Sequence, residues 1–403
     1  MKLTRIFAIV AVILAILLAY NFPKLQRLLR VNSLFKEERI VNNFSDMQGL
    51  FFNTEMAVKS PTPTKLPKNP QPMPESLTFR GTTQSFADWH TSRNHTAMVV
   101  LKDGQIAYEV YFKDTEDTDR RVSWSMAKSF LSAAFGVAVN DGLIPDLDAQ
   151  VTQYVPSLVG SAYDGATIRN VMNMSSGIKF NEDYLDSKSD INKMGRVLAL
   201  GKSMDGFTEG QSESDREPGS RRKYVSIDTH VIGMVLRAAT GKSVPDYLSE
   251  TILKPLGLEA DAYYLTDGFG TAFVLGGLNM RTRDYARFGL MMAQNGQLNG
   301  EQVVPMDWIK QSTSNSAPPS YDGDVGSDYE LLGYGFQWWL PPNPTEGEFF
   351  AIGVYGQYIY VNQAENVVIA VNAVDRKFRN GSGEITILNL TAFREIVETL
   401  RNN

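Results

Sequence analysis

The stretch RRVSWSMAKSFLSAAFGVAVNDGLI, residues 120–144, decides both the fold and the candidate chemistry. Its apolar residues recur at helical spacing, which predicts a helix that opens at Ser125 and ends near Gly142. Residues three apart are neighbours on a helix, so Lys128 can reach the hydroxyl of Ser125. The start of a helix also offers free backbone N–H groups and the positive end of its dipole to a developing anion. The stretch therefore contains a candidate nucleophile beside a candidate base.

The pattern Ser-x-x-Lys is a weak signal by itself, because it occurs four times in the chain. Ser33 precedes the predicted main domain, and Ser220 opens a charged segment that we expect to be exposed. Ser176 is followed by Gly177, which breaks the helical turn that would bring its lysine alongside. Context therefore selects Ser125. The four pairs are Ser33/Lys36, Ser125/Lys128, Ser176/Lys179 and Ser220/Lys223.

The candidate pair has a catalytic and a structural interpretation. A serine hydroxyl becomes a good nucleophile only when a base removes its proton. Lysine can be that base if burial lowers its pKa enough to keep it neutral. In the structural alternative, Ser123 caps the helix and Lys128 is a solvated surface side chain. The motif alone favours the structural alternative, so the catalytic one depends on other segments.

The composition narrows the class of protein. The 403 residues carry a net charge of −6, and 43% of them are hydrophobic, which is typical of a globular chain with a sizeable core. No basic stripe is present, so nucleic acid is not an expected partner. The chain has no cysteine and only three histidines, His90, His95 and His230. His90 and His95 are five residues apart and have no acidic neighbour at ligand spacing, so we do not expect a metal site.

The N-terminal region predicts attachment to a membrane. Residues 5–22, RIFAIVAVILAILLAYNF, have no charge after Arg5 and are long enough to cross a bilayer as a signal anchor. A cleaved signal peptide is the alternative, although Leu17 stands where a small residue is needed. The predicted organisation is a short tail at 1–4, the span at 5–22, a juxtamembrane segment at 23–59, a stiff Pro-rich linker at 60–76 and one domain at 77–403.

Strand patterns stand at both ends of that domain. Residues 96–112, TAMVVLKDGQIAYEVYF, predict a hairpin that turns at Asp103 and Gly104. Residues 334–341, 348–363 and 366–374 predict further strands, and residues 385–401 predict a closing helix. Helical and loop patterns fill the middle of the chain. The predicted fold class is α+β, with an antiparallel sheet built from both ends and a helical subdomain between them.

Six segments, taken in order, resemble the serine β-lactamase-like hydrolases, and within them the branch of class C β-lactamases and 6-aminohexanoate-dimer hydrolases. The resemblance covers most of residues 77–403 and implies the β-lactamase/transpeptidase fold. The segments are SWSMAKSF (123–130), MNMSSGIKFNEDYLD (172–186), YVSIDTHVIGMVLRAATG (224–241), YLSETILKPLGL (247–258), GGLNMRTRDYARFG (276–289) and AIGVYGQYIYV (351–361).

The resemblance implies a role for particular residues. Ser125 matches the acylated nucleophile, Lys128 its partner and Tyr224 the second general acid/base. The backbone N–H groups of Ser125 and Val354 match the oxyanion hole, with Gly353 permitting a close approach. Substrate contacts are implied for Tyr184, Ser226, Gly353 and Tyr355.

One departure from the family pattern bears on the substrate. The Lys-Thr-Gly element of β-lactamases and penicillin-binding proteins is Ala351-Ile352-Gly353 here. The missing lysine removes a fixed positive charge that would bind a substrate carboxylate, so efficient β-lactamase activity is not expected.

The resemblance implies a serine hydrolase that cleaves a small-molecule amide or ester through an acyl-enzyme on Ser125 and needs no cofactor. With the predicted span at residues 5–22, the enzyme is expected to be anchored in a membrane. The resemblance also implies a domain on the extracytoplasmic side of the cytoplasmic membrane. A β-lactamase or D,D-carboxypeptidase is the first alternative. A penicillin-binding sensor that is acylated without turnover is the second, and a non-catalytic scaffold is the third. The sequence leaves the oligomeric state open.

Overall fold

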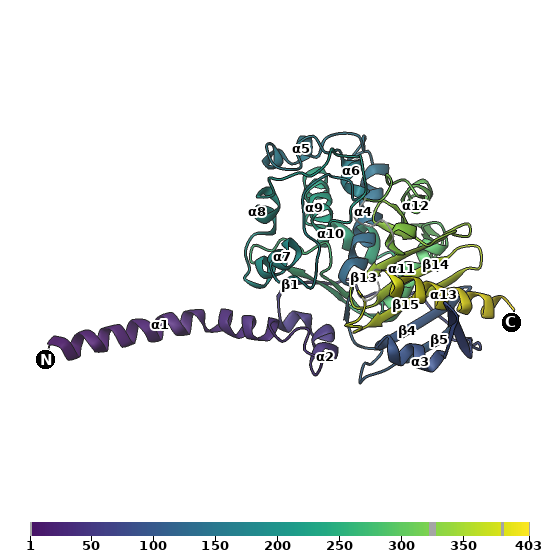
Figure 1. The fold of residues 1–403 in the computed structure, drawn as a ribbon, viewed down its shortest axis with the longest axis horizontal. Helices are drawn as coiled ribbons and strands as arrows, with labels where there is room; N and C mark the ends of the chain where they lie inside the picture. Colours follow the sequence, from purple (N-terminus) through teal and green to yellow (C-terminus); the bar gives the residue numbers. More distant parts are fainter. Residues whose placement is uncertain (1, 322–327, 380–382, 403) are drawn as a thin grey trace.

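A computed structural model describes residues 2–321, 328–379 and 383–402 of the chain. Its centre is a seven-stranded antiparallel sheet that joins strands from both ends of the chain (Figure 1). The order across the sheet is β11-β12-β13-β14-β15-β4-β5. The α+β prediction is therefore confirmed. The strands are β4 (His95–Lys102), β5 (Gln105–Tyr111), β11 (Gly333–Gly335), β12 (Trp338–Leu340), β13 (Glu348–Gly353), β14 (Gln357–Asn362) and β15 (Val367–Ala373).

The hairpin between β4 and β5 forms where the sequence predicts it. Asp103 and Gly104 have φ angles of 52° and 75°, which a tight two-residue turn between twisted strands requires. β4 pairs on its other side with β15, in a register that places Val99 opposite Ala370. The two halves of the sheet are thus joined by strands that lie far apart in the sequence.

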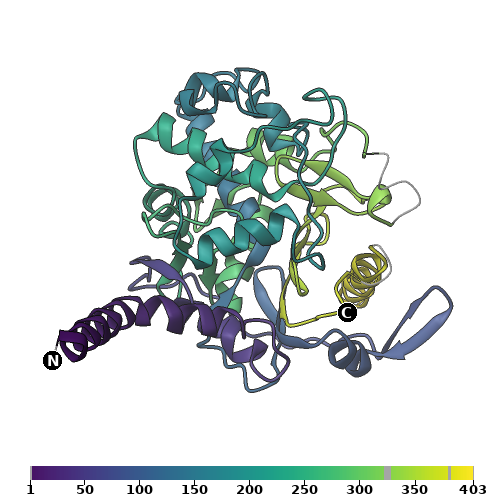
Figure 2. The ribbon, with the colours of Figure 1, turned by 60° about the vertical axis from the view of Figure 1, so that its left-hand side comes forward.

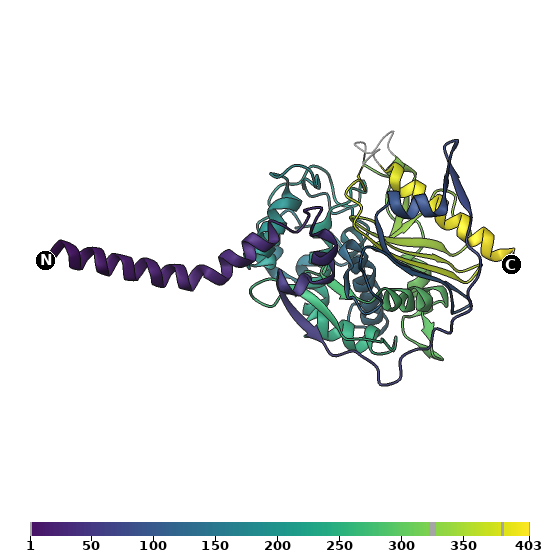
Figure 3. The same ribbon diagram turned by 90° about the horizontal axis from the view of Figure 1, so that it is seen from below.

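Helices cover both faces of the sheet, and for this reason its central strands are buried on both sides. α13 (Glu384–Arg401) and α3 (Phe86–Ser92) cover one face, where Phe393 and Trp89 join a buried apolar cluster. Figure 3 shows α13 in yellow along this face. α11 (Thr282–Ala293) packs on the opposite face against β14 and β15.

A helical subdomain lies beside the sheet, with most of its helices in teal in Figure 2. At its centre α4 (Ala127–Asn140) packs against α9 (Ser226–Thr240), so the helix after Ser125 and the helix after Tyr224 are neighbours. Further elements here are α5 (Val151–Tyr154), η3 (Pro156–Leu158), α6 (Ile168–Met172), α7 (Asp190–Ala199), α8 (Met204–Glu209), α10 (Val244–Leu248), η4 (Ser249–Leu253) and α12 (Met306–Ser312).

Smaller sheets complete the fold. A four-stranded sheet with the order β1-β7-β8-β6 lies beside the helices, and two hairpins stand at the periphery. The first sheet holds β1 (Phe52–Met56), β6 (Arg121–Val122), β7 (Ala262–Thr266) and β8 (Leu278–Met280), and the hairpins are β2 (Ser76–Phe79) with β3 (Thr82–Ser85) and β9 (Gln297–Leu298) with β10 (Glu301–Gln302).

The apolar N-terminal stretch lies in α1 (Lys2–Val31), which extends away from the body (Figure 1). Within the described part of the chain, no helix is both long enough and apolar enough to cross a membrane. The predicted transmembrane span at residues 5–22 is therefore not supported, and several side chains of this stretch lie outside the described residues.

The juxtamembrane segment, expected to precede the domain, packs into its core instead. Phe44 in α2 (Ile40–Ser45) and Met47 in η1 (Met47–Gly49) are fully buried in the main apolar cluster. β1 then pairs with β7. An amphipathic segment buries its apolar face wherever a partner is available, and here the partner is the domain itself.

The Pro-rich residues 60–76 are extended, as expected, but they run along the surface in contact with the domain. Thr64 N–H donates to Gly257 O at 2.9 Å, and Ile106 N–H donates to Pro67 O at 2.8 Å. The predicted boundary at residue 77 therefore does not separate two units, because residues on both sides of it belong to one packed body.

Candidate active site

Ser125 lies at a sharp turn between β6 and α4. The turn is the 3-10 element η2 (Trp124–Met126), and α4 begins only at Ala127. Trp124 has a φ of 43°, a left-handed conformation that is rare for a residue with a bulky side chain. Ser123 does not cap the helix as the structural alternative required; its hydroxyl donates to Trp124 O at 3.0 Å. The nucleophile candidate thus stands on strained backbone, a feature that is frequent at functional sites.

Lys128 is buried and faces Ser125. Its side chain is 2% exposed, and Nζ lies 3.2 Å from Ser125 Oγ and 2.9 Å from the carbonyl oxygen of Leu275. Burial lowers the pKa of Lys128 to about 7, while the carboxylates of Glu182 and Asp228 oppose the decrease. A lysine with this pKa is partly neutral at neutral pH. The solvated lysine of the structural alternative is therefore wrong.

Tyr224 lies beside Ser125 and forms a hydrogen bond with it. Its ring stacks on Trp339 with centroids 5.5 Å apart, and Lys128 Nζ lies 5.6 Å from the ring centroid. Burial raises the pKa of Tyr224 and Glu182 raises it further, while a hydrogen bond with Ser125 opposes the increase. The phenol therefore keeps its proton at neutral pH and can donate it.

Glu182 is a site residue that the sequence analysis did not identify. Its carboxylate accepts a hydrogen bond from Ser226 N–H at 3.0 Å, one from the Ser226 hydroxyl, and one from Tyr184 Oη at 2.7 Å. Ser226 Oγ in turn lies 3.5 Å from Lys128 Nζ. The segment FNEDYLD contains Glu182, but nothing in the sequence indicates that its carboxylate contacts Ser226, the first residue of α9.

Asp228 lies beneath the site on α9 and is fully buried. It accepts hydrogen bonds from Ser176 Oγ at 2.8 Å and Tyr163 Oη at 2.9 Å. Burial raises the pKa of Asp228 to about 7, although these two hydrogen bonds oppose the increase. Ser176 is thus a partner of Asp228, in agreement with its exclusion as nucleophile.

Gly353, at the end of β13, lies against the turn that holds Ser125. A Cβ atom at Gly353 would be 2.5 Å from the carbonyl oxygen of Ser123, so no other residue fits without displacing backbone. Val354 follows it, and Tyr355 has a φ of 64°. Ser125, Gly353 and Val354 line the same cavity. An oxyanion hole formed by the N–H groups of Ser125 and Val354 requires this proximity.

An aromatic cluster packs beside this turn. Phe35 stacks on Tyr355 with centroids 4.9 Å apart and lies 6.0 Å from the Trp124 ring. Phe44 contacts the same two rings edge-on, each at 5.5 Å. Two rings from the N-terminal segment thus hold the residues that precede Ser125 and follow Val354. The predicted substrate contact Tyr355 belongs to this cluster and not to the cavity lining.

The cavity in front of Ser125 has a volume of about 530 Å³, enough for a small organic substrate. Tyr184 is on its wall, as predicted, together with Glu182 and the cationic Lys223 and Arg379. Arg379 lies over the Tyr184 ring at 5.2 Å. The other predicted contact, Ser226, lies behind Glu182 and does not line the cavity.

Comparisons with known proteins agree with this geometry. A family model described as Beta-lactamase matches residues 87–386. A 6-aminohexanoate-dimer hydrolase of Paenarthrobacter ureafaciens is 29% identical over 280 residues, which cover 68% of this chain and 71% of that protein. A putative D-alanyl-D-alanine carboxypeptidase of Escherichia coli is 24% identical over 141 residues, 34% of this chain and 32% of that protein.

Solved structures give the same fold. A Bacillus anthracis protein, provisionally described as a 6-aminohexanoate-dimer hydrolase, superposes with a TM-score of 0.78 at 22% identity, covering 92% of this chain and 96% of that one. A penicillin-binding protein homologue of Caulobacter crescentus superposes with a TM-score of 0.55 at 16% identity, covering 74% and 92%. The family match and the arrangement of Ser125 and Tyr224 around the buried Lys128 lead to one conclusion: the chain belongs to the beta-lactamase family and is a serine hydrolase.

Proposed function

We propose that the protein cleaves a linear amide or ester through an acyl-enzyme on Ser125. The observation that carries the proposal is the buried lysine: Lys128 Nζ lies 3.2 Å from Ser125 Oγ, and burial lowers its pKa to about 7. A neutral amine at hydrogen-bond distance from a hydroxyl is a competent general base.

In the acylation step, Lys128 takes the proton of Ser125 as Oγ bonds to the substrate carbonyl carbon. The backbone N–H groups of Ser125 and Val354 stabilise the resulting oxyanion. The carbon–nitrogen or carbon–oxygen bond then breaks, and Tyr224 donates its proton to the leaving group and regains one from Lys128. In deacylation a water molecule takes the place of the leaving group, and the same proton transfers run in reverse. The acid is released and the hydroxyl of Ser125 is restored.

The substrate side of the proposal rests on the third motif and on the relatives. Ala351 is buried on β13 where β-lactamases carry the lysine of Lys-Thr-Gly, and it offers no charge to a β-lactam carboxylate. A relative that aligns over 68% of the chain is described as a 6-aminohexanoate-dimer hydrolase, and its substrate is a linear amide. Linear amides and esters are therefore the first substrates to test, and β-lactams the second.

The test combines active-site labelling with turnover. A fluorophosphonate should label Ser125, and the purified protein should hydrolyse p-nitrophenyl esters or 6-aminohexanoate dimer in steady state. Ser125→Ala should abolish both. Ser220→Ala removes a hydroxyl from another Ser-x-x-Lys pair, one whose Oγ donates to Glu217 O in an exposed loop, and should keep the wild-type rate.

Other outcomes separate the alternatives. A stable β-lactam adduct on Ser125 without steady turnover would assign a penicillin-binding sensor, and fast nitrocefin hydrolysis would assign a β-lactamase. Full ester turnover by Ser125→Ala would refute the mechanism.

We also propose that α1 holds the protein at the cytoplasmic membrane, with the hydrolase domain on the extracytoplasmic side. Support comes from the exposed apolar side chains along α1, among them Ile6, Phe7, Val12 and Ile16. Carbonate extraction of membranes and protease digestion of spheroplasts test this proposal. Release by carbonate, or protection of the domain in intact spheroplasts, would contradict it.

A further inference from the structure

An apolar face lies where α1 meets the body of the protein. Its large hydrophobic side chains come from α1, from β1, from the residue after α7 and from the turn after β7, and they are between 40% and 76% exposed. Single exposed apolar residues are ordinary, but several on one face indicate an interaction surface. We call this the junction face; its members are Leu25, Leu29, Phe52, Leu200 and Phe269.

Direct contacts make the junction face continuous. Arg27 Nε donates to the carbonyl oxygen of the last residue of α7 at 3.0 Å, and the guanidinium lies 4.0 Å from the centre of the Phe52 ring. The Phe52 ring lies against Gly201, where a Cβ atom would be 2.5 Å from it. Gly268 in turn lies so close to Gly201 that a Cβ atom would overlap its carbonyl oxygen. The residue after Gly268 is Phe269, so the four segments form one surface.

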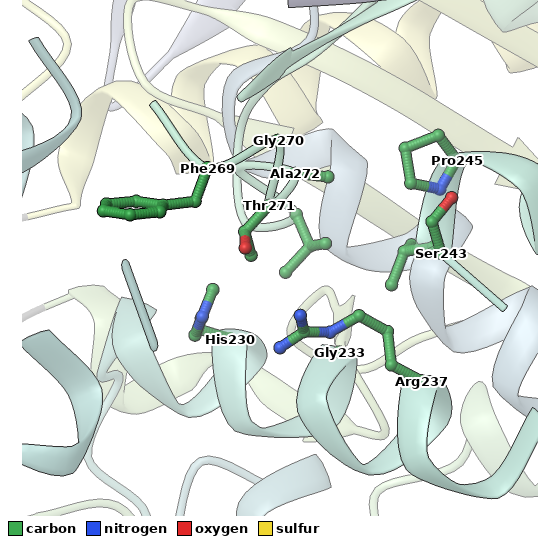
Figure 4. A pocket seen from close by; sticks show the side chains of 11 residues that line it. His230, Gly233, Arg237, Ser243, Pro245, Phe269, Gly270, Thr271 and Ala272 are labelled. Atoms are coloured by element: carbon green, nitrogen blue, oxygen red, sulfur yellow. The ribbon is translucent and has the colours of Figure 1, made fainter. Parts of the chain in front are cut away.

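The turn that carries Phe269 has a fixed backbone. Asp267 is 1% exposed, and its Oδ1 accepts from the N–H groups of Phe269 and Thr271 at 2.8 and 2.9 Å. Its Oδ2 accepts from Met204 N–H at 2.9 Å. Figure 4 shows the Phe269 ring on the side of the turn away from Ser243. A buried carboxylate thus holds this aromatic ring in its exposed position.

Basic side chains border the junction face. Arg30 follows Leu29 on α1, and Lys202 lies two residues after Leu200; both are exposed. Three segments of the face contain no acidic residue: 25–30, 199–202 and 268–270. An anionic lipid surface attracts basic residues next to an apolar anchor. A second copy of the chain that met this face with its own would instead repel them, so the charge favours lipid as the occupant.

The junction face also lies at a suitable depth. Figure 1 shows α7 and α8 at the edge of the body toward which α1 extends. The apolar run of α1 ends at Phe22, and Arg27 lies five residues later, about 7.5 Å along the helix. Helices that lie in a bilayer interface bury their apolar face to a depth of about 5–10 Å around the headgroup boundary. With the apolar run in a bilayer, the junction face is therefore level with the headgroups.

We propose that the junction face docks on the surface of an anionic lipid bilayer. Phe269 and Leu200 contact the acyl boundary, while Arg30 and Lys202 contact lipid phosphates. The proposal rests on the attachment through α1 proposed above and adds that the domain lies against the bilayer. α7 leads from this face to the loop 181–189 on the wall of the cavity, a length of about 15 Å. Docking thus holds the candidate active site at a fixed short distance from the lipid.

The test uses the absence of cysteine from the chain, because a single introduced cysteine can then carry an NBD fluorophore. The full chain with labelled Phe269→Cys is reconstituted into vesicles of phosphatidylglycerol and phosphatidylethanolamine. We expect a blue shift, about threefold higher emission than in detergent-free buffer, and quenching by spin-labelled lipid. The matched control is Val159→Cys, which is 64% exposed and follows η3, and η3 packs against α5 at the far end of the subdomain (Figure 1). Its emission should not change.

Second substitutions in the labelled protein test the two kinds of contact. Leu200→Ser removes an apolar side chain, and Lys202→Gln removes a charge; each should lower the NBD emission of vesicle-bound Phe269→Cys about twofold. Replacing phosphatidylglycerol by phosphatidylcholine should have the same effect as Lys202→Gln. All of these positions lie outside the lining of the cavity in front of Ser125, so a wild-type rate of ester hydrolysis shows that each variant is folded.

The outcomes separate this proposal from the attachment through α1. Unshifted emission from Phe269→Cys protein that floats with the vesicles would refute the docking and leave the attachment intact. Protein that does not float with the vesicles would refute both. Equal shifts for Phe269→Cys and Val159→Cys would overturn the docking, since the face would have no special contact with lipid. A shift that grows with protein concentration at constant lipid would assign the face to a second copy of the chain and would also overturn it.

Discussion

Replacing Lys128 by methionine should stabilise the protein while it slows hydrolysis strongly. The buried amine has a pKa of about 7, whereas an unfolded lysine has its ordinary value of 10.5. Folding at pH 7 therefore requires loss of a proton that the unfolded chain keeps. By linkage this costs about 4 kcal/mol at pH 7 and about 2 kcal/mol at pH 9. Methionine has a similar length and carries no such cost.

A lost hydrogen bond offsets part of the gain. Lys128 Nζ lies 2.9 Å from Leu275 O, and a buried carbonyl left without a donor costs about 1–3 kcal/mol. The expected net result at pH 7 is an increase of about 1–3 kcal/mol in the free energy of unfolding. Acylation should fall by about 10²–10⁴, the usual contribution of a general base.

The sign of the pH dependence gives the sharper measurement. Wild-type stability should rise between pH 7 and pH 9, because the unfolded lysine holds a proton that the folded one has released. Lys128→Met lacks this contribution, so its advantage should shrink by about 2 kcal/mol over the same interval. Urea unfolding followed by tryptophan fluorescence at both pH values measures the difference. If wild type and variant keep a constant difference, Lys128 is protonated in the folded protein and its role as base is refuted.

Three further predictions concern the same site. Below neutral pH, kcat/KM for ester hydrolysis should rise about tenfold per pH unit and level off above pH 7, as Lys128 loses its proton; a midpoint near pH 10 would contradict the assignment. Gly353→Ala should lower kcat by about 10², because the new Cβ displaces the Ser123–Ser125 turn. Gly195→Ala adds a Cβ in open space on α7, so this control should keep the wild-type rate and melt at an equal or higher temperature. Phe35→Ala should lower kcat about tenfold and reduce the free energy of unfolding by about 1 kcal/mol. Phe52 has a similar exposure, and Phe52→Ala should reduce stability without changing kcat. Equal rates for the two variants would be evidence against a role of the Phe35 ring in holding the turn at Ser125.

The fold could be predicted from the sequence because its signals are local. The hairpin at Asp103 and Gly104 needs only two residues that tolerate positive φ between apolar runs. The spacing of Ser125 and Lys128 could be read in the same way, and the structure brings the pair together. The expected helix start lies two residues too early, because the left-handed Trp124 depends on aromatic packing that the sequence does not display.

Other features depended on contacts that no local pattern encodes. The amphipathic residues before the Pro-rich stretch have the same pattern whether their apolar face meets a membrane or a domain. Phe44 and Met47 meet the domain. Glu182 is one acidic residue in a polar loop, and its contact with Ser226 becomes visible only when α9 is placed beside that loop. Sequence reasoning therefore identified Ser125 and Lys128, which the structure brings together, and missed Glu182 beside them.

The pairing of β4 with β15 has a consequence for synthesis of the chain. Val99 pairs with Ala370, which is synthesised about 270 residues later. At about 5–20 residues per second, the delay between the two strands is roughly 15–50 s. During that time the β4–β5 hairpin offers an unpaired, apolar edge to any neighbour. Translation that stops before β15 would leave this edge permanently open. Yield should therefore depend on chaperone supply and on growth temperature more steeply than the stability of the finished protein would suggest.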